Sequence, residues 1–122
     1  MIFNGDDDKP RQNKAISKFT ESFSGSFKRL SPNDVDYRIY NKDGEIIAYA
    51  QVICVYDTIS KSKQLEVLAD KAVRVTNKMM NPIIIWAFDD GIAYIKLKNS
   101  EGRVYHKEGR LFISYPRDRV IY

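Results

Sequence analysis

The chain has 122 residues, 43% of them hydrophobic and 30% charged, which is the composition of one soluble globular domain with a single core. Lys and Arg exceed Asp and Glu by 20 to 16, and residues 103–122 supply most of the net charge of +4. No apolar run approaches the roughly 20 residues that cross a bilayer, and the N-terminus lacks the order of a signal peptide. One cysteine and one histidine exclude an internal disulfide and a Cys/His zinc site. We therefore expect one domain over residues 1–122 that acts in the cytoplasm and has no membrane partner.

The first predicted element is an amphipathic helix. Residues 1–9 contain three consecutive aspartates, which are typical of a flexible, solvated arm. Asp8 followed by Pro10 is typical of a helix N-cap with proline in the first turn. Large apolar side chains then recur every three or four residues, as a helix that packs on a sheet requires; they are Ile16, Phe19, Phe23, Phe27 and Leu30. We expect this helix to end at Ser31.

Residues 35–55 predict a β-hairpin. Asp43 and Gly44 stand between two runs of alternating strand-forming residues, and Asp-Gly in that position favours a type I′ turn. With these two residues at the centre of the turn, the numbers of cross-strand partners sum to 87, which places Asp36 opposite Gln51. Because side chains alternate between the faces of a strand, one face of the hairpin is apolar core. The other face gathers Asp34, Asp36, Arg38 and Gln51.

A second, long helix is expected over residues 60–80, where apolar side chains stand in helical register. Pro82 ends it, since proline excludes the helical conformation from the residue before it. One turn before the apolar stripe lies Lys61, which could approach the polar face of the hairpin. A lysine at a helix end that reaches water is the alternative interpretation.

A second hairpin follows over residues 83–98, and its first strand is apolar throughout, which predicts burial on both faces. Residues 103–122 are expected to form short edge strands and loops. The order α-β-β-α-β-β predicts an α/β (α+β) fold with a mixed β-sheet flanked by helices, because a crossover through a helix joins parallel strands. The basic residues of the last segment are candidate phosphate contacts; they are Arg103, Lys107, Arg110, Arg117 and Arg119.

The order of elements resembles that of the PD-(D/E)XK nuclease superfamily, as does an Asp on the first hairpin strand with a polar residue on the second. This restriction-endonuclease-like fold includes Holliday-junction resolvases and small phage endonucleases. The resemblance implies two acids that hold Mg²⁺ and a lysine that activates the attacking water. On this chain Asp36 takes the position of the first acid, with Asp34 just ahead of it. Gln51 takes the position of the second acid and Ile53 that of the lysine.

Two functions of that motif are missing, since Gln51 carries no charge and Ile53 cannot polarise water. Three interpretations remain open. In the first, this is a phage or mobile-element protein that has lost cleavage, needs no cofactor, and binds DNA or a DNA-processing partner. In the second, it is an active Mg²⁺-dependent endonuclease in which Lys61 or Lys63 has taken the lysine role and Asp34 and Asp36 hold the metal. In the third, it is a protein-binding inhibitor of a host enzyme. Nucleases of this fold often cut both strands as dimers, so a homodimer is also compatible with the resemblance.

Overall fold

The computed structural model describes residues 3–5, 8–30, 36–62, 64–76, 81–99, 101–117 and 119–122. Along the chain the elements are β1 (Phe3–Gly5), α1 (Lys9–Glu21), β2 (Ser26–Arg29), β3 (Tyr37–Tyr40), β4 (Ile46–Val55), η1 (Ile59–Lys61), β5 (Gln64–Leu68), α2 (Ala69–Thr76), β6 (Pro82–Ala87), β7 (Ile92–Lys96), η2 (Leu97–Asn99), β8 (Arg103–Lys107), β9 (Arg110–Pro116) and β10 (Arg119–Ile121).

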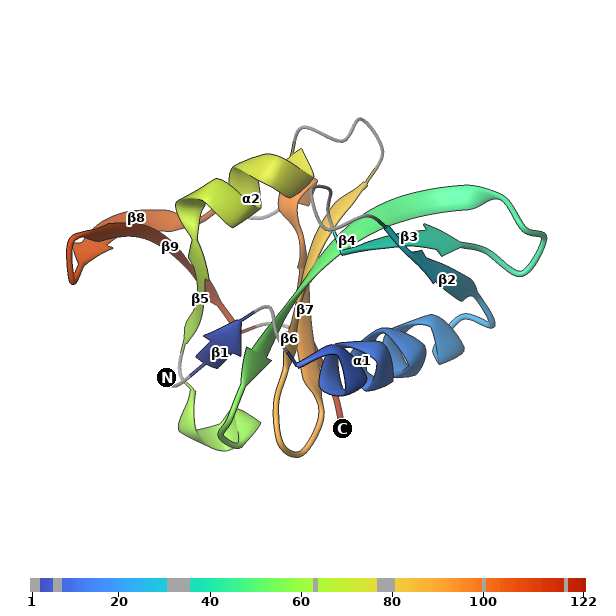
Figure 1. The fold of residues 1–122 in the computed structure, drawn as a ribbon, viewed down its shortest axis with the longest axis horizontal. Coiled ribbons are helices and arrows are strands. Elements are labelled where there is room, and N and C mark those ends of the chain that lie inside the picture. The colour runs from blue at the N-terminus through green and yellow to red at the C-terminus, as the bar shows by residue number, and fades with distance from the viewer. Residues whose placement is uncertain are drawn as a thin grey trace.

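The fold is mixed α+β, and its described residues form two sheets and two α-helices (Figure 1). The larger sheet has the order β10-β7-β6-β4-β3-β2, and β1 pairs with the end of β4; the smaller sheet has the order β5-β9-β8. β4 and β6 are parallel, and the chain between them forms β5 and α2, so the expected crossover is present. Neither α1 nor α2 has the length and apolar character needed to cross a bilayer.

The first helix begins as predicted but ends early. Asp8 caps α1, its Oδ1 accepting from the backbone N of Arg11 at 3.1 Å, and Pro10 lies in the first turn. The helix stops at Glu21, because Ser24 turns the chain with a φ of 59° and Gly25 packs where a Cβ would lie 2.5 Å from the carbonyl oxygen of Tyr40. Residues 26–29, predicted as the helix end, instead form β2 against β3.

The β3–β4 hairpin has the predicted register away from its turn. Tyr37 pairs with Ala50 and Ile39 with Ala48, so the partner numbers sum to 87, whereas Tyr40 pairs with Ile46 across an irregularity. Gly44 has the expected positive φ of 81°. The two-residue type I′ turn was wrong, because the loop begins at Asn41, whose Oδ1 accepts from the backbone N of Asp43 at 3.0 Å and of Glu45 at 2.9 Å. That longer loop absorbs the register shift.

The predicted helix over residues 60–80 was wrong in its first half, so the order α-β-β-α-β-β is not observed. Residues 64–68 form β5. Leu65 and Val67 are buried on one face of the strand, while Gln64, Glu66 and Leu68 on the other face are less buried. Pairing with β9 gives one side of this segment its backbone hydrogen bonds, and α2 begins only at Ala69. Residues 77–80 lie outside the described part of the chain.

The two chain ends add strands to the larger sheet. Phe3–Gly5, part of the expected arm, pair antiparallel with β4 at Cys54 and Val55. β10 pairs with β7, and the second hairpin, β6 with β7, has the predicted form. The last residues of the chain pass close to its turn, since a Cβ on Gly91 would lie 2.5 Å from the carbonyl oxygen of Ile121.

The sheet separates two apolar layers. α1 packs with the face of β4 that carries Ala48, Ala50 and Val52, while Ile53 and the opposite face pack with α2, β5 and β9. Every residue of β6 is buried, as predicted, and Trp86 is fully buried between the sheets. The indole Nε1 of Trp86 donates to the carbonyl oxygen of Glu66 in β5 at 2.7 Å, which links the larger sheet to the smaller one.

Candidate functional site

Asp36 directly precedes β3, one residue beyond the ladder pair of Tyr37 with Ala50, and continuing that register places it opposite Gln51. Its Oδ2 accepts a hydrogen bond of 2.7 Å from the backbone N of Val52, and its carbonyl oxygen accepts one of 3.0 Å from the backbone N of Leu30. The carboxylate therefore holds β3 against β4 where the regular ladder ends.

Gln51 and Ile53, at the positions of the second acid and the lysine, lie inside the protein. Their exposed fractions are 1% and 2%, and Ile53 belongs to the apolar layer beneath α2. Within the described structure, Oε1 of Gln51 has no hydrogen-bond partner. An unpaired buried acceptor of this kind costs about 1–3 kcal/mol of stability.

The side-chain oxygens of Asp36 and Gln51 do not fit Mg²⁺. The ion needs near-octahedral oxygen ligands and keeps several waters, whereas Gln51 is closed off from solvent and one oxygen of Asp36 is bonded to the backbone. Among the described residues, no group of three Asp, Glu, His or Cys side chains could hold a metal.

Arg38 is a fixed cation on the same face of the hairpin. Its guanidinium lies over the ring of Tyr49, 5.7 Å from the centroid, and its Nη1 donates to the hydroxyl oxygen of Tyr40 at 3.4 Å. Interactions with the Tyr40 hydroxyl and then with that of Tyr49 raise the pKa of Arg38. The guanidinium and the two tyrosines thus form a charged, aromatic group beside Gln51.

The structure does not bring Lys61 to this group. Its ammonium lies 3.8 Å from Oδ1 of Asp57 and is 72% exposed, and it belongs to η1, beyond the carboxyl end of β4. The strand from Gln51 to Val55 alone spans about 13 Å. Lys63 and Asp34 lie outside the described residues.

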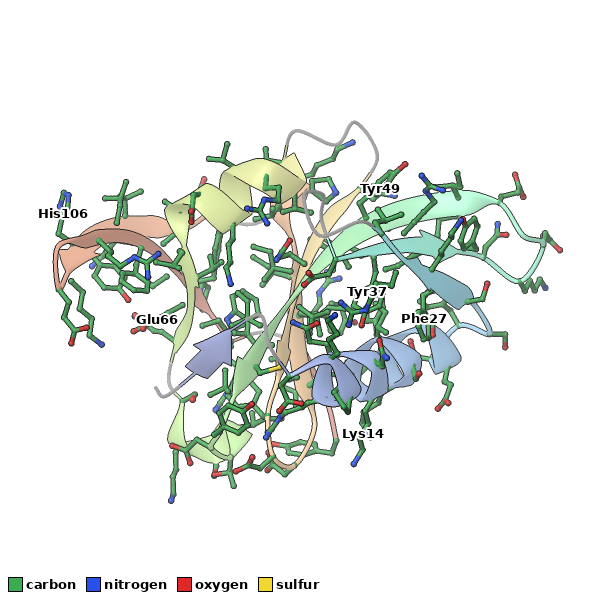
Figure 2. All side chains as sticks on the ribbon, in the orientation of Figure 1. Lys14, Phe27, Tyr37, Tyr49, Glu66 and His106 are labelled. Carbon is green, nitrogen blue, oxygen red and sulfur yellow. The ribbon has the colours of Figure 1, made fainter. Side chains whose placement is uncertain are left out.

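The β8–β9 hairpin projects from the body of the protein and carries three of the predicted phosphate contacts (Figure 1). Glu108 and Gly109 form its turn, both with positive φ, 53° and 75°, and Lys107 pairs with Arg110. This is the geometry of a type I′ turn. Alternation then places one set of side chains on one face of the hairpin, which we call the basic face: Arg103, Tyr105, Lys107, Arg110 and Phe112. His106 lies on the opposite face, near the outer end of the hairpin (Figure 2).

An aromatic pair forms the centre of the basic face. The rings of Tyr105 and Phe112 stack with centroids 5.7 Å apart and an interplanar angle of 20°. The Tyr105 hydroxyl is buried near the Glu66 side chain, whose Oε2 is also buried. Burial, reinforced by Glu66, raises the pKa of Tyr105 to about 12. The pair therefore supports the hairpin, and the cations around it reach solvent.

The two remaining predicted phosphate contacts are exposed residues that each contact another part of the fold. Nη1 of Arg117 donates to the carbonyl oxygens of Ile59 and, at 2.8 Å, Ser62. Arg119 stands over the ring of Tyr94, 6.0 Å from the centroid. Arg117 thus fixes η1, and only Arg103, Lys107 and Arg110 of the predicted set share one face.

A second polar network beneath α1 was not expected from the sequence. Arg29 donates to Oε1 of Gln12 at 2.9 Å, to Oδ1 of Asn13 at 3.2 Å and to the hydroxyl oxygen of Tyr37 at 2.5 Å. Burial raises the pKa of Tyr37 to about 12. The residue pattern does not predict this network, because a helix that ends at Ser31 would place Arg29 in its last turn.

We predict that Gln51→Leu stabilises the protein by about 1 kcal/mol, because it removes an unpaired buried acceptor while keeping a side chain of similar size. Urea denaturation followed by far-UV circular dichroism would measure the change. Gln64→Leu in the exposed part of β5 is the matched control and should give no gain. A loss of stability for Gln51→Leu would mean that the amide is needed where it lies.

We also predict that the free energy of unfolding falls as pH rises from 10 to about 12. Tyr37 and Tyr105 have folded-state pKa values of about 12 against an ordinary value of 10.0, so in this range the folded state retains protons that the unfolded state has lost. Their contribution is complete below pH 10. Urea titrations at several alkaline pH values would measure the slope. The Tyr37→Phe, Tyr105→Phe double variant should show a shallower fall, and an unchanged slope would contradict the assignment.

Comparison of the chain with protein-family models, with curated proteins and with solved structures finds no match. Function is therefore inferred from the residues and contacts described above.

Proposed function

We propose that the protein binds nucleic acid through the basic face of the β8–β9 hairpin, and that its restriction-endonuclease-like core no longer performs metal-dependent cleavage. The observation that carries the proposal is the gathering of Arg103, Lys107 and Arg110 on one face of a projecting hairpin. The cytoplasm is the expected place of action.

The spacing of these cations suits a phosphate backbone. Arg103 and Lys107 are four residues apart on one strand, about 13 Å, and one strand of DNA carries a charge about every 3.4 Å along the axis. The basic face can thus meet several consecutive phosphates, and a two-stranded ribbon is narrow enough for a major groove. Tyr105 and Phe112 are engaged in supporting the hairpin, so contacts through charge, without sequence readout, are the expected mode.

The arrangement of the core favours a nuclease-like fold, whereas the residues at its motif positions do not favour catalysis. Helices lie on opposite faces of a mixed sheet, and β4 is joined to a parallel β6 by a crossover, which agrees with the arrangement that the resemblance implies. The positions that would hold the second acid and the lysine are buried, and Lys61 is paired with Asp57 away from them. Cleavage would need charges where the fold has placed apolar packing.

The opposite face of the same hairpin favours a second candidate function, the binding of a protein partner. Val104 is 58% exposed and Leu111 41% exposed on that face, and β8 is an edge strand that pairs only with β9 among the described residues. An edge of this kind can accept a further strand from another protein.

Binding is tested by fluorescence anisotropy with labelled single- and double-stranded DNA at several salt concentrations. We expect affinity to fall steeply with salt, and the triple variant R103Q/K107Q/R110Q to lower the slope of log affinity against log salt by about one unit for each cation removed. The matched control K28Q/K42Q/R74Q removes three exposed cations from other elements and should keep the wild-type slope. Equal losses in the two triple variants would contradict the hairpin interface, and no binding by the wild type would favour the protein-partner candidate.

Cleavage is tested separately on supercoiled and branched DNA with Mg²⁺ or Mn²⁺. We expect no cleavage, because the buried amide and isoleucine cannot supply the missing charges. Cleavage that is abolished by Asp36→Asn would overturn this half of the proposal. Asparagine keeps an acceptor for the backbone N of Val52, so loss of activity would not reflect loss of the fold.

A further inference from the structure

A cavity of about 540 Å³ lies between α1 and the turn that joins β6 to β7. Its size is in the usual range of small-molecule sites, roughly 300–1,000 Å³. It opens beside the carboxyl ends of β4 and β6, the parallel pair of the sheet, and ligands of open α/β sheets bind outside the carboxyl ends of the strands. Neither the basic face nor the Asp36 region contributes to it.

The walls of this cavity are held in place. The backbone N of Phe88 donates to the carbonyl oxygen of Gly91 at 2.9 Å, and that of Asp89 donates to the carbonyl oxygen of Asp57 at 2.9 Å. Gly91 is packed against the chain near Ile121, so close that a Cβ would not fit. Arg11 anchors α1 to the same turn through its 2.6 Å ion pair with Asp89. These contacts within the fold fix the walls of the cavity, and a preformed site lowers the entropic cost of binding.

Several charges of the lining are engaged in bonds within the fold. Asp8 accepts from the hydroxyl of Tyr56 at 2.5 Å and from the backbone N of Arg11, and the Tyr56 hydrogen bond lowers the pKa of the Asp8 carboxyl. Arg11 is bound to Asp89 and to the carbonyl oxygen of Val55. Oδ1 of Asp90 accepts from the first backbone N–H of η1 at 3.0 Å, and its second oxygen remains as an acceptor.

Lys14 and Lys18 are different, because neither ammonium has an ion pair or hydrogen bond with the described residues. They are four residues apart on α1 and therefore lie on one side of the helix. Both line the cavity, and Figure 2 shows Lys14 pointing away from the helix at the end of the molecule where the β6–β7 turn lies. Two unengaged ammonium groups on one wall suit a doubly charged anion such as a phosphomonoester.

The chemistry changes across the cavity. The lysines stand on the α1 wall, Ala15, Ala87 and Ile92, each only 2–4% exposed, lie at the apolar base, and Asp90 stands on the turn. A matching ligand has a phosphate at one end, a flat apolar body and an N–H donor at the other end. We propose that this cavity binds a nucleotide with a 5′-phosphate and an exocyclic amino group, with the phosphate on Lys14 and Lys18 and the amino group toward Asp90.

The ligand could be a free mononucleotide or the phosphorylated 5′ end of a nucleic acid, since the two share this chemistry. Isothermal titration calorimetry on the full chain would compare AMP, IMP, adenosine and inorganic phosphate. We expect AMP to bind at least tenfold more tightly than adenosine, which lacks the phosphate, and more tightly than IMP, which lacks the amino group. Oligonucleotides with 5′-phosphate and 5′-hydroxyl ends distinguish the two sources. A preference for the phosphorylated end with no binding of AMP would assign the site to a nucleic-acid terminus.

The variant K14Q/K18Q should weaken AMP binding at least tenfold, and the matched control K28Q/K42Q, on β2 and the β3–β4 turn, should leave it unchanged. Amide NMR shifts on adding AMP should centre on Ala87, Gly91 and Ile92. The R103Q/K107Q/R110Q variant should bind AMP as the wild type does, so this site and the hairpin interface can fail independently. The proposal is overturned if neither AMP nor the 5′-phosphorylated oligonucleotide binds better than its unphosphorylated counterpart, or if K14Q/K18Q binds the phosphorylated ligand like the wild type.

Discussion

The parallel pairing of β4 with β6 is the contact on which the rest of the structure depends. It buries both faces of the two strands, so that one apolar layer forms against α1 and another against α2, β5 and β9. The same pairing requires a crossover, and the chain that makes it supplies the strand on which the smaller sheet is built. The carboxyl ends of the pair leave the cavity beside α1, and the middle of the pair encloses Gln51. The cavity beside α1 and the closed position of Gln51 are thus consequences of one buried strand pair.

Burial at the middle of β4 constrains what residues 51 and 53 can be. An ionised carboxylate and an ammonium placed there would lose their hydration, and a buried pair recovers this loss only with good geometry and further hydrogen bonds. Gln51 and Ile53 fill this space without a charge, and the amide oxygen of Gln51 is the atom left without a hydrogen-bond partner among the described residues. Charge has instead been placed on the β8–β9 hairpin and on the outer side of α1, where side chains keep their water. Positions 51 and 53 are therefore poorly suited to holding a metal ion.

Local chemistry in the sequence predicted the features that depend on near neighbours. The Asp8 cap, the β3–β4 register away from its turn and the burial of residues 83–88 were confirmed, because capping, strand alternation and apolar runs act over a few residues. The strands β2 and β5 were missed because Phe27 and Leu65 also fit a helical spacing, and only pairing with β3 and β9 decides their conformation. The cavity could not be predicted, since Lys14 and the β6–β7 turn meet only through the tertiary fold. The basic face was partly predictable: its cations were identified, but their separation from Arg117 depends on contacts with η1.

The hydrogen bond from Trp86 to Glu66 has a practical consequence. Trp86 is the one tryptophan of the chain, and its indole N–H is bonded to the smaller sheet while its ring is packed in the larger one. Any separation of the two sheets would break that bond and admit water to the indole. Its emission would then shift to longer wavelength even if the helices and the larger sheet stayed intact. The fluorescence of Trp86 thus reports on the contact between the two sheets, and therefore on the attachment of the β8–β9 hairpin.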